Sequence, residues 1–224
     1  MTYQPVDLWG DLAHPDRTPA PGPGRPRWPL RFAAFKAAFD LFFAIANLPL
    51  ILALSILLLI LNPFFNPGPL FFFQTRMGRG CRPFTLWKFR TMSCAGRGFR
   101  GHADRVEEDR ITPLGNPLRR TRLDEVPNFV NVLRGDMSVI GPRPDMVEHA
   151  LAYSITVPRY RARFGIKPGI TGLAQIRHGY VDHVDGVLRK ARNDHIYIRR
   201  ACVRLDLAIA WRTLKVMFTG YGAR

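Results

Sequence analysis

Cysteine is scarce in this chain of 224 residues, and its three cysteines, Cys81, Cys94 and Cys202, are widely spaced. An odd number at such spacing supports neither a disulfide framework nor a zinc knuckle, so a reducing compartment fits best. The six histidines do not show the spacing of a metal site such as HExxH, and we interpret them as scattered surface residues. The sequence also contains no internal repeat.

Acidic residues are also few: 17 Asp and Glu stand against 33 Lys and Arg, which gives a formal net charge of +16. A chain this basic is expected to meet an anionic partner, such as nucleic acid, anionic lipid headgroups or a phosphorylated substrate. Codon bias would also raise the arginine content. A basic, membrane-tethered nucleic-acid-binding protein is one alternative, but no recognition motif supports it, so we expect no nucleic-acid partner.

Residues 1–30 lack any apolar periodicity and carry seven of the 19 prolines. Such a stretch cannot bury enough apolar surface to fold, so it predicts a disordered tail. It does not resemble a secretory signal, because no apolar core follows a short basic start.

Residues 41–61 form a run of about 21 residues without a charge, which is long enough to span a bilayer. Asn47 and Pro49 interrupt the run: proline removes a helical hydrogen bond, and lipid disfavours the asparagine amide. Two structures fit these residues, a kinked spanning helix and a re-entrant helix hairpin that enters and leaves by one leaflet. The residues alone favour the spanning helix, because proline is tolerated there.

The remainder predicts an α+β fold, mainly helical with a small β-hairpin. Residues 70–74 and 83–89 are typical of two short strands, and the glycines at 78 and 80 predict the turn between them. Apolar side chains repeat at helical spacing over residues 123–133. Residues 205–218 form a second amphipathic stretch, expected either in the core or at a membrane surface.

Two basic motifs are candidates for phosphate binding. Lys88 and Arg90 stand at i and i+2 on a predicted strand, so they are expected on one face and could clamp a diphosphate. An exposed basic strand edge is the alternative. Arg143 lies between two prolines, which would present its guanidinium rigidly to a phosphate. An ordinary surface turn is the alternative there.

An acidic pair, Asp124 and Glu125, precedes the predicted helix. Thr121 and Asp124 have the spacing of a capping box, and Pro127 is tolerable only near a helix start. Both carboxylates are therefore expected in the first turn, where they could hold Mg²⁺ and supply a nucleophile. Ordinary helix-start acids are the alternative.

Taken in order, these motifs resemble the monotopic phosphoglycosyl transferases, also called the bacterial sugar transferase family. The resemblance covers about residues 36–218 and rests on the strings FDLFFAIANLPL, NPGPLFFFQTRMGRGCRPFTLWKFRTM, RRTRLDEVPNFVNVLRGDMSVIGPRP, KPGITGLAQI and YIRRACVRLDLAIAWRTLKV. The chain looks like the minimal form of the family, without the multi-span region of larger members.

The resemblance implies roles for the polar motifs. Asp124 is implied as the nucleophile and a Mg²⁺ ligand, with Glu125 as its catalytic partner. Arg143 is implied as a phosphate-binding residue, and Lys88 and Arg90 as basic residues near the active site. The implied reaction transfers a phosphosugar from a UDP-sugar to polyprenol (undecaprenyl) phosphate through an aspartyl intermediate. A catalytically idle scaffold of the same fold is the alternative.

The resemblance also implies how the chain meets the membrane. Pro49 matches the proline that breaks the membrane helix, which reverses the preference for a spanning helix. We therefore expect residues 31–66 to be a re-entrant helix in the cytoplasmic leaflet of the bacterial inner membrane, and residues 67–224 to be a cytosolic transferase domain. Thr171 and Gln175 are expected in the nucleotide-sugar region. The sugar and the oligomeric state are not indicated.

Overall fold

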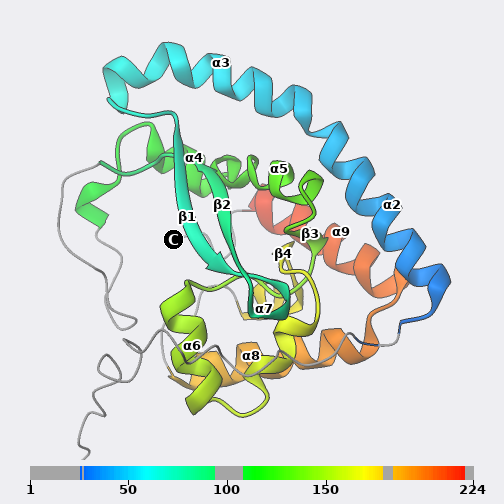
Figure 1. Ribbon diagram of the computed structural model, residues 1–224. Helices are drawn as coiled ribbons and strands as arrows, with labels where there is room; N and C mark the ends of the chain where they lie inside the picture. Colours follow the sequence, from blue (N-terminus) through cyan, green and yellow to red (C-terminus); the bar gives the residue numbers. More distant parts are fainter. Residues whose placement is uncertain (1–25, 27, 94–107, 179–183, 220–224) are drawn as a thin grey trace, which may run out of the picture.

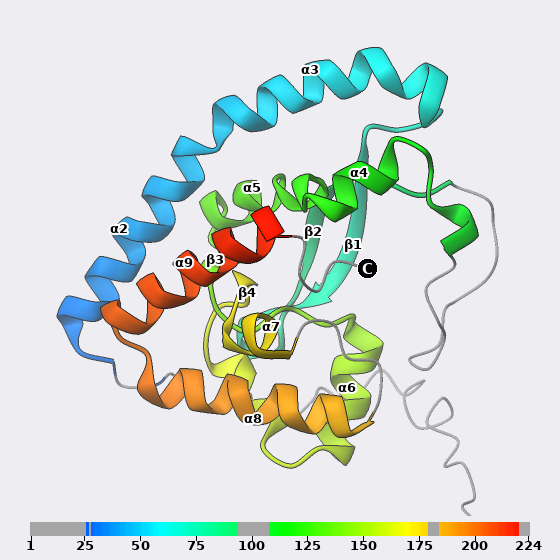
Figure 2. The same ribbon diagram turned by 180° about the vertical axis from the view of Figure 1, so that it is seen from behind.

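The computed structural model describes residues 26, 28–93, 108–178 and 184–219 (Figures 1 and 2). The predicted tail therefore lies almost entirely outside the described residues. The described part is mainly helical with two small β-sheets, in agreement with the expected α+β class.

The apolar segment forms two consecutive helices, α2 (Leu30–Ala46) and α3 (Leu48–Phe65), which meet at Asn47. Pro49 stands in the first turn of α3, where its missing N–H removes no helical bond. The predicted interruption is therefore present. The two helices form an open arc along one side of the domain and do not fold back on each other (Figures 1 and 2). Re-entry into one leaflet stays a prediction.

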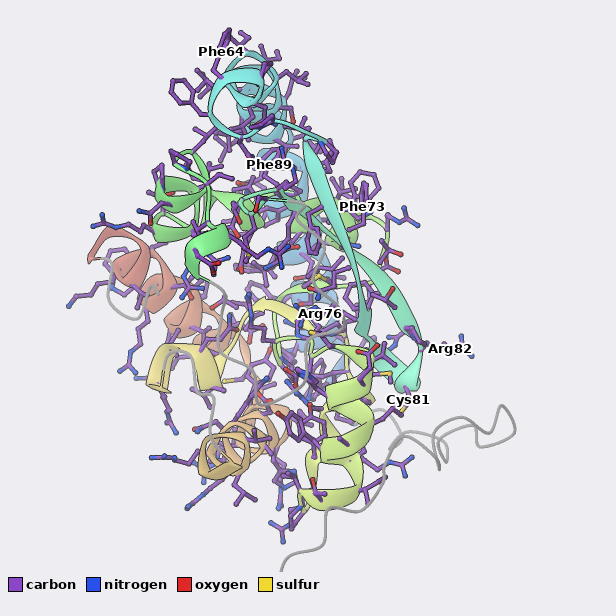
Figure 3. The ribbon with its side chains drawn as sticks, turned by 90° about the vertical axis from the view of Figure 1, so that its left-hand side faces the viewer. Phe64, Phe73, Arg76, Cys81, Arg82 and Phe89 are labelled. Carbon is purple, nitrogen blue, oxygen red and sulfur yellow. The ribbon has the colours of Figure 1, made fainter. Side chains whose placement is uncertain are left out.

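One side of this arc is apolar and exposed, and the other side packs on the domain. Together, α2 and α3 span 36 residues, long and apolar enough to cross a membrane. Phe64 is 78% exposed and lies on the outer side of α3 (Figure 3). On the inner side, Leu54 and Leu58 of α3 are buried against Val126 and Phe89. The inner side of α3 thus belongs to the core, whereas its outer side is exposed.

The predicted β-hairpin is confirmed. β1 (Phe71–Met77) and β2 (Pro83–Phe89) pair in antiparallel register, from Phe71 opposite Phe89 to Met77 opposite Pro83. The connection is a short 3₁₀ turn, η1 (Arg79–Cys81), in which Gly80 adopts the left-handed backbone conformation that favours glycine.

The centre of the molecule holds a second, parallel pair of strands, β3 (Ser138–Ile140) and β4 (Gly169–Thr171). Gly141 and Gly169 allow their chains to touch, since a Cβ built on Gly169 would lie 2.1 Å from the nitrogen of Gly141. This contact brings the Gly-Pro-Arg-Pro turn beside the Pro-Gly-Ile-Thr-Gly segment, which are far apart in the sequence.

The remaining elements surround these two sheets. Among them, α9 has one buried face. Asp206 and Ile209 of α9 are buried, whereas Trp211 is 72% exposed. The elements are η2 (Glu108–Arg110), α4 (Gly115–Arg120), η3 (Leu123–Glu125), α5 (Asn128–Leu133), α6 (Val147–Thr156), η4 (Tyr160–Gly165), α7 (Leu173–His178), α8 (Val184–Arg200) and α9 (Val203–Thr219).

Two charged side chains of α2 fix it to β3. The Nζ of Lys36 donates to the Ile140 carbonyl at 2.8 Å and pairs with Asp206 at 3.0 Å. One turn further along, Asp40 accepts a hydrogen bond from the backbone N–H of Val139 at 2.8 Å. Because β3 runs directly into the Gly-Pro-Arg-Pro turn, α2 sets the position of that turn.

Candidate active site

The acidic pair lies in a 3₁₀ turn rather than at the start of a long helix. Asp124 and Glu125 belong to η3, and α5 begins three residues after Glu125. The predicted cap is wrong, because the Thr121 hydroxyl donates to the Pro117 carbonyl at 2.8 Å and so closes the preceding helix. Arg122, in the left-handed backbone conformation, separates the two turns.

Glu125 is buried and is held by two cations. Lys88 donates to its Oε1 at 3.0 Å, and Arg143 donates to Oε2 at 3.0 Å and also to Oε1. Burial alone would raise the pKa of Glu125, but the charges of Arg143 and Lys88 hold that pKa well below its usual range. Glu125 is therefore an ionised residue with both oxygens occupied.

Asp124 has a contrasting environment. It is 9% exposed, and it makes no hydrogen bond or ion pair with any residue that the structure describes. Burial, followed by the charge of Glu125, raises the pKa of Asp124 to about 6, against the opposing effect of Lys88 and Arg143. A buried carboxylate without a partner is free to attack a substrate or to bind a metal.

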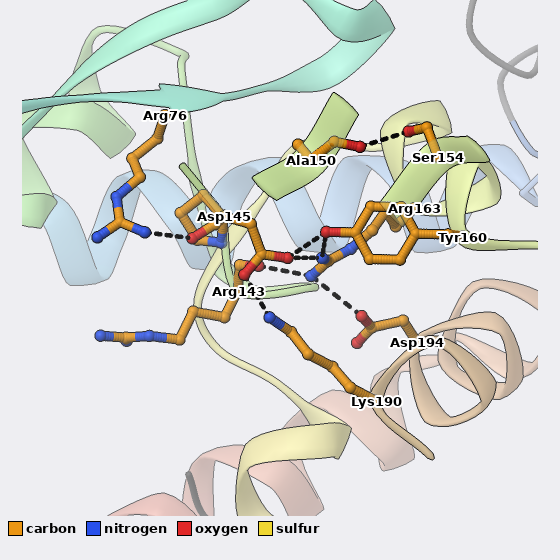
Figure 4. Close-up of polar contacts among 10 residues, drawn as sticks. Arg76, Arg143, Asp145, Ala150, Ser154, Tyr160, Arg163, Lys190 and Asp194 are labelled. Carbon is orange, nitrogen blue, oxygen red and sulfur yellow. Dashed lines mark hydrogen bonds and ion pairs between the residues drawn. The ribbon is translucent and has the colours of Figure 1, made fainter. Parts of the chain in front are cut away.

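Arg143 owes its position to a buried polar network that the sequence analysis missed (Figure 4). Arg163 donates to the backbone carbonyl of Arg143 and pairs with Asp145, two residues further on. Asp145 also accepts hydrogen bonds from the Tyr160 hydroxyl and from Lys190. Although burial opposes it, Lys190 and Arg163 keep the pKa of Asp145 far below its usual range.

A second carboxylate completes this network. Asp194 lies 3.1 Å from Arg163, and burial raises its pKa to about 6. On the other side of the turn, Arg76 donates to the Pro144 carbonyl at 3.4 Å. These contacts hold the turn that carries Arg143, and no local sequence pattern signals them because their members come from separate segments.

Arg90 does not join Lys88 as predicted. β2 ends one residue before it, so the alternation of a strand no longer places the two side chains on one face. The guanidinium of Arg90 is buried and donates to the backbone carbonyls of Asn66, Pro69 and Met92. Arg90 therefore links the end of α3 to the hairpin by hydrogen bonds. Its guanidinium is directed at these carbonyls and not at the acidic pair, in contrast to the predicted phosphate-binding position.

Thr171 and Gln175 lie on β4 and α7. The Thr171 hydroxyl is 2.8 Å from that of Thr213 on α9, and the Gln175 amide donates to the Ile170 carbonyl at 3.2 Å. Their hydrogen bonds thus go to neighbouring elements and not to the acidic pair. A contact with the nucleotide-sugar stays a prediction.

The site suits a magnesium ion that is shared with a substrate. No group of three or more His, Cys, Asp or Glu side chains gathers in the described ranges, so a cage built from protein ligands alone is not present there. Mg²⁺ is commonly held by one or two carboxylates together with substrate phosphates and water. Asp124, with its oxygens not engaged by other described side chains, fits that mode, whereas Glu125 does not.

Comparison with known proteins gives one family and several relatives. The family described as bacterial sugar transferase matches residues 31–220. A UDP-N-acetylgalactosamine-undecaprenyl-phosphate N-acetylgalactosaminephosphotransferase of Aeromonas hydrophila is 37% identical over 194 residues, which cover 86% of this chain and 46% of the relative. A UDP-glucose:undecaprenyl-phosphate glucose-1-phosphate transferase of Caulobacter vibrioides is 41% identical over 156 residues, which cover 69% of this chain and 58% of the relative.

A third relative is matched over most of its length. An exopolysaccharide production protein of Rhizobium leguminosarum bv. phaseoli is 35% identical over 185 residues, which cover 80% of this chain and 92% of the relative. By contrast, the chain spans about half the length of the first two relatives.

Proposed function

We propose, because this chain belongs to the bacterial sugar transferase family, that it transfers a phosphosugar from a UDP-sugar to a polyprenol phosphate and releases UMP. The names of the relatives supply the class of donor and acceptor. The observation in this chain that carries the proposal is the contrast within the acidic pair: Glu125 is clamped by two cations, whereas Asp124 is buried without a partner among the described residues.

In the first step, an Asp124 oxygen attacks the phosphorus that bears the sugar. The bond from this phosphorus to the bridging oxygen of the diphosphate breaks, and UMP leaves with the electron pair. A covalent aspartyl-phosphosugar results, so that one difficult displacement becomes two easier ones. Glu125 cannot take this role without breaking its contacts with Lys88 and Arg143.

In the second step, a phosphate oxygen of the polyprenol phosphate attacks the same phosphorus. The Asp124 carboxylate leaves, and a polyprenol diphosphate sugar is formed. The two steps need no net proton transfer when the acceptor phosphate is a dianion. The bond between the sugar and its oxygen is never broken.

Charge repulsion is the main obstacle, since an anionic carboxylate must approach an anionic diphosphate. Arg143 and Lys88 lie next to the pair and can offset this charge as it develops. Glu125 keeps both cations in place before the substrate arrives. Mg²⁺ bound at Asp124 would supply further neutralisation of the phosphate oxygens.

The apolar arc explains how a lipid carrier reaches the site. Leu54 and Leu58 of α3 pack on Val126, next to the acidic pair, and Leu123 adjoins the same cluster. If the exposed side of α3 lies in the cytoplasmic leaflet, the pair is held close to the plane where the acceptor phosphate resides. The soluble donor would then enter from the cytosolic side.

The test uses purified full-length protein, Mg²⁺, undecaprenyl phosphate and a panel that includes UDP-glucose and UDP-N-acetylgalactosamine, with UMP release as the readout. Incubation with the donor alone should add the mass of one phosphosugar to the wild type and none to Asp124→Asn. UMP release without such an adduct would overturn the covalent route. No UMP with any donor would favour an idle scaffold.

A further inference from the structure

Asn128 is a buried side chain that the mechanism above does not use. It is the first residue of α5, three positions after Glu125, and only 2% of it is exposed. Its Oδ1 is buried and has no hydrogen-bond partner in the described part of the chain. The amide nitrogen makes no hydrogen bond with another described residue either. A buried carbonyl oxygen without a hydrogen-bond partner costs free energy.

Asn131, one turn further along the same helix, is an asparagine whose side-chain oxygen and nitrogen both make hydrogen bonds. It is fully buried. Its Oδ1 accepts the N–H of Trp87 at 3.0 Å, and its amide donates to the Thr85 carbonyl at 2.7 Å. Asn131 therefore holds β2 on α5, a structural role that Asn128 does not share.

The surroundings of Asn128 point to an anionic ligand. It lines a small cavity together with three cations, Arg76, Lys88 and Arg143, of which Lys88 and Arg143 also pair with Glu125. In Figure 4 the guanidinium groups of Arg76 and Arg143 lie on the same side of the Asp145 network, and a hydrogen bond joins Arg76 to the Pro144 carbonyl. The cavity has room for about one water-sized group, so a single phosphate oxygen fits and a sugar ring does not.

We propose that Asn128 is a phosphate-binding residue, whose amide donates a hydrogen bond to a diphosphate oxygen of the donor substrate. The carboxamide presents a donor at one end and an acceptor at the other, and rotation places the donor toward the cavity. A neutral donor adds a hydrogen bond without a further charge that would need pairing before the substrate binds. This inference rests on the proposed function, since the diphosphate is that of the UDP-sugar.

The experiment compares Asn128→Leu with Asn131→Leu. Asn128→Leu should keep or raise the melting temperature, because it removes an unsatisfied polar group. It should lower kcat/KM for UMP release and the affinity for the UDP-sugar by about 10- to 100-fold, the value of a hydrogen bond to a charged group. Asn131→Leu should lower the melting temperature, because it breaks the hydrogen bonds of Asn131 with Trp87, Thr85 and Asp136.

Two results would overturn the inference. Wild-type kcat/KM and affinity in Asn128→Leu would show that no substrate contact is lost. A lower melting temperature with activity retained would show that Asn128 holds a structural water instead. Asn128→Ala replaces the leucine variant if the latter does not fold. If the wild type releases no UMP, the proposed reaction is wrong, and calorimetric binding of UDP to the wild type and the Asn128 variant decides the phosphate contact by itself.

Discussion

Replacement of Asp124 by asparagine should abolish turnover and at the same time stabilise the protein. Asp124 is buried, and it has no hydrogen bond or ion pair with the described residues to offset its desolvation. Asparagine has nearly the same shape as the protonated acid, so it removes the buried charge without opening a cavity. An amide is, however, a poor nucleophile and a poor metal ligand, so UMP release should stop.

The magnitude follows from the pKa of Asp124, which burial and the charge of Glu125 raise from an ordinary 3.8 to about 6. That difference corresponds to about 3 kcal/mol of destabilisation of the native state when Asp124 is ionised. A raised carboxyl pKa means that the folded protein binds the proton more tightly than the unfolded chain. The destabilisation is therefore complete above pH 6 and is lost as the pH falls from 6 toward 3.8.

Thermal unfolding at pH 8 and pH 4, in EDTA, measures the effect. At about 2–4 °C per kcal/mol, the variant should melt up to about 6–12 °C above the wild type at pH 8, and only slightly above it at pH 4. Added Mg²⁺ should stabilise the wild type more than the variant. An asparagine variant that is less stable than the wild type at both pH values, or that retains turnover, would refute this account of Asp124.

Other predictions concern the neighbouring cations, the buried network and the membrane. Arg143→Ala should lose about 2–4 kcal/mol of transition-state stabilisation, and an unchanged kcat/KM would exclude a direct role. Asp145→Asn should cost about 3–5 kcal/mol of stability, because it leaves Arg163 and Lys190 without their shared carboxylate, and a melting temperature close to that of the wild type would contradict this. Single cysteines at Leu30 and Asp109, in a cysteine-free background, should both be protected from an impermeant reagent in spheroplasts until lysis. Labelling of the Leu30 site from outside would exclude re-entry.

Local sequence patterns correctly predicted the features of the fold that depend on residues close together in the chain. The strand alternation and the glycines gave the hairpin, and the interruption at Asn47 and Pro49 coincides with the junction of α2 and α3. The motifs around Lys88, Glu125 and Arg143 do come together in one site. The hairpin and the helix junction depend on backbone preferences within a few residues, whereas the common site of the three motifs was implied by the family resemblance.

Features that depend on distant contacts could not be predicted in this way. Arg90 lies just past the end of the strand that carries Lys88, and two of its carbonyl partners, Asn66 and Pro69, follow the end of α3. Lys36 precedes the apolar run of residues 41–61 in the sequence, and nothing local to it indicates that it is buried against Asp206. The pairing of Asp145 with Arg163 and Lys190 depends on the packing of helices that the sequence does not place.

The ribosome synthesises Lys36 of α2 long before the residues that Lys36 contacts in the folded protein. Ile140 follows Lys36 by 104 residues, and Asp206 follows it by 170. Until α9 has emerged, the ammonium group of Lys36 lies at the edge of an apolar segment without its carboxylate, and membrane lipid disfavours such a charge. If α2 lies in the membrane as proposed, it can reach its final depth only when α9 has folded onto it, so that membrane insertion and folding of the rest of the chain are completed together.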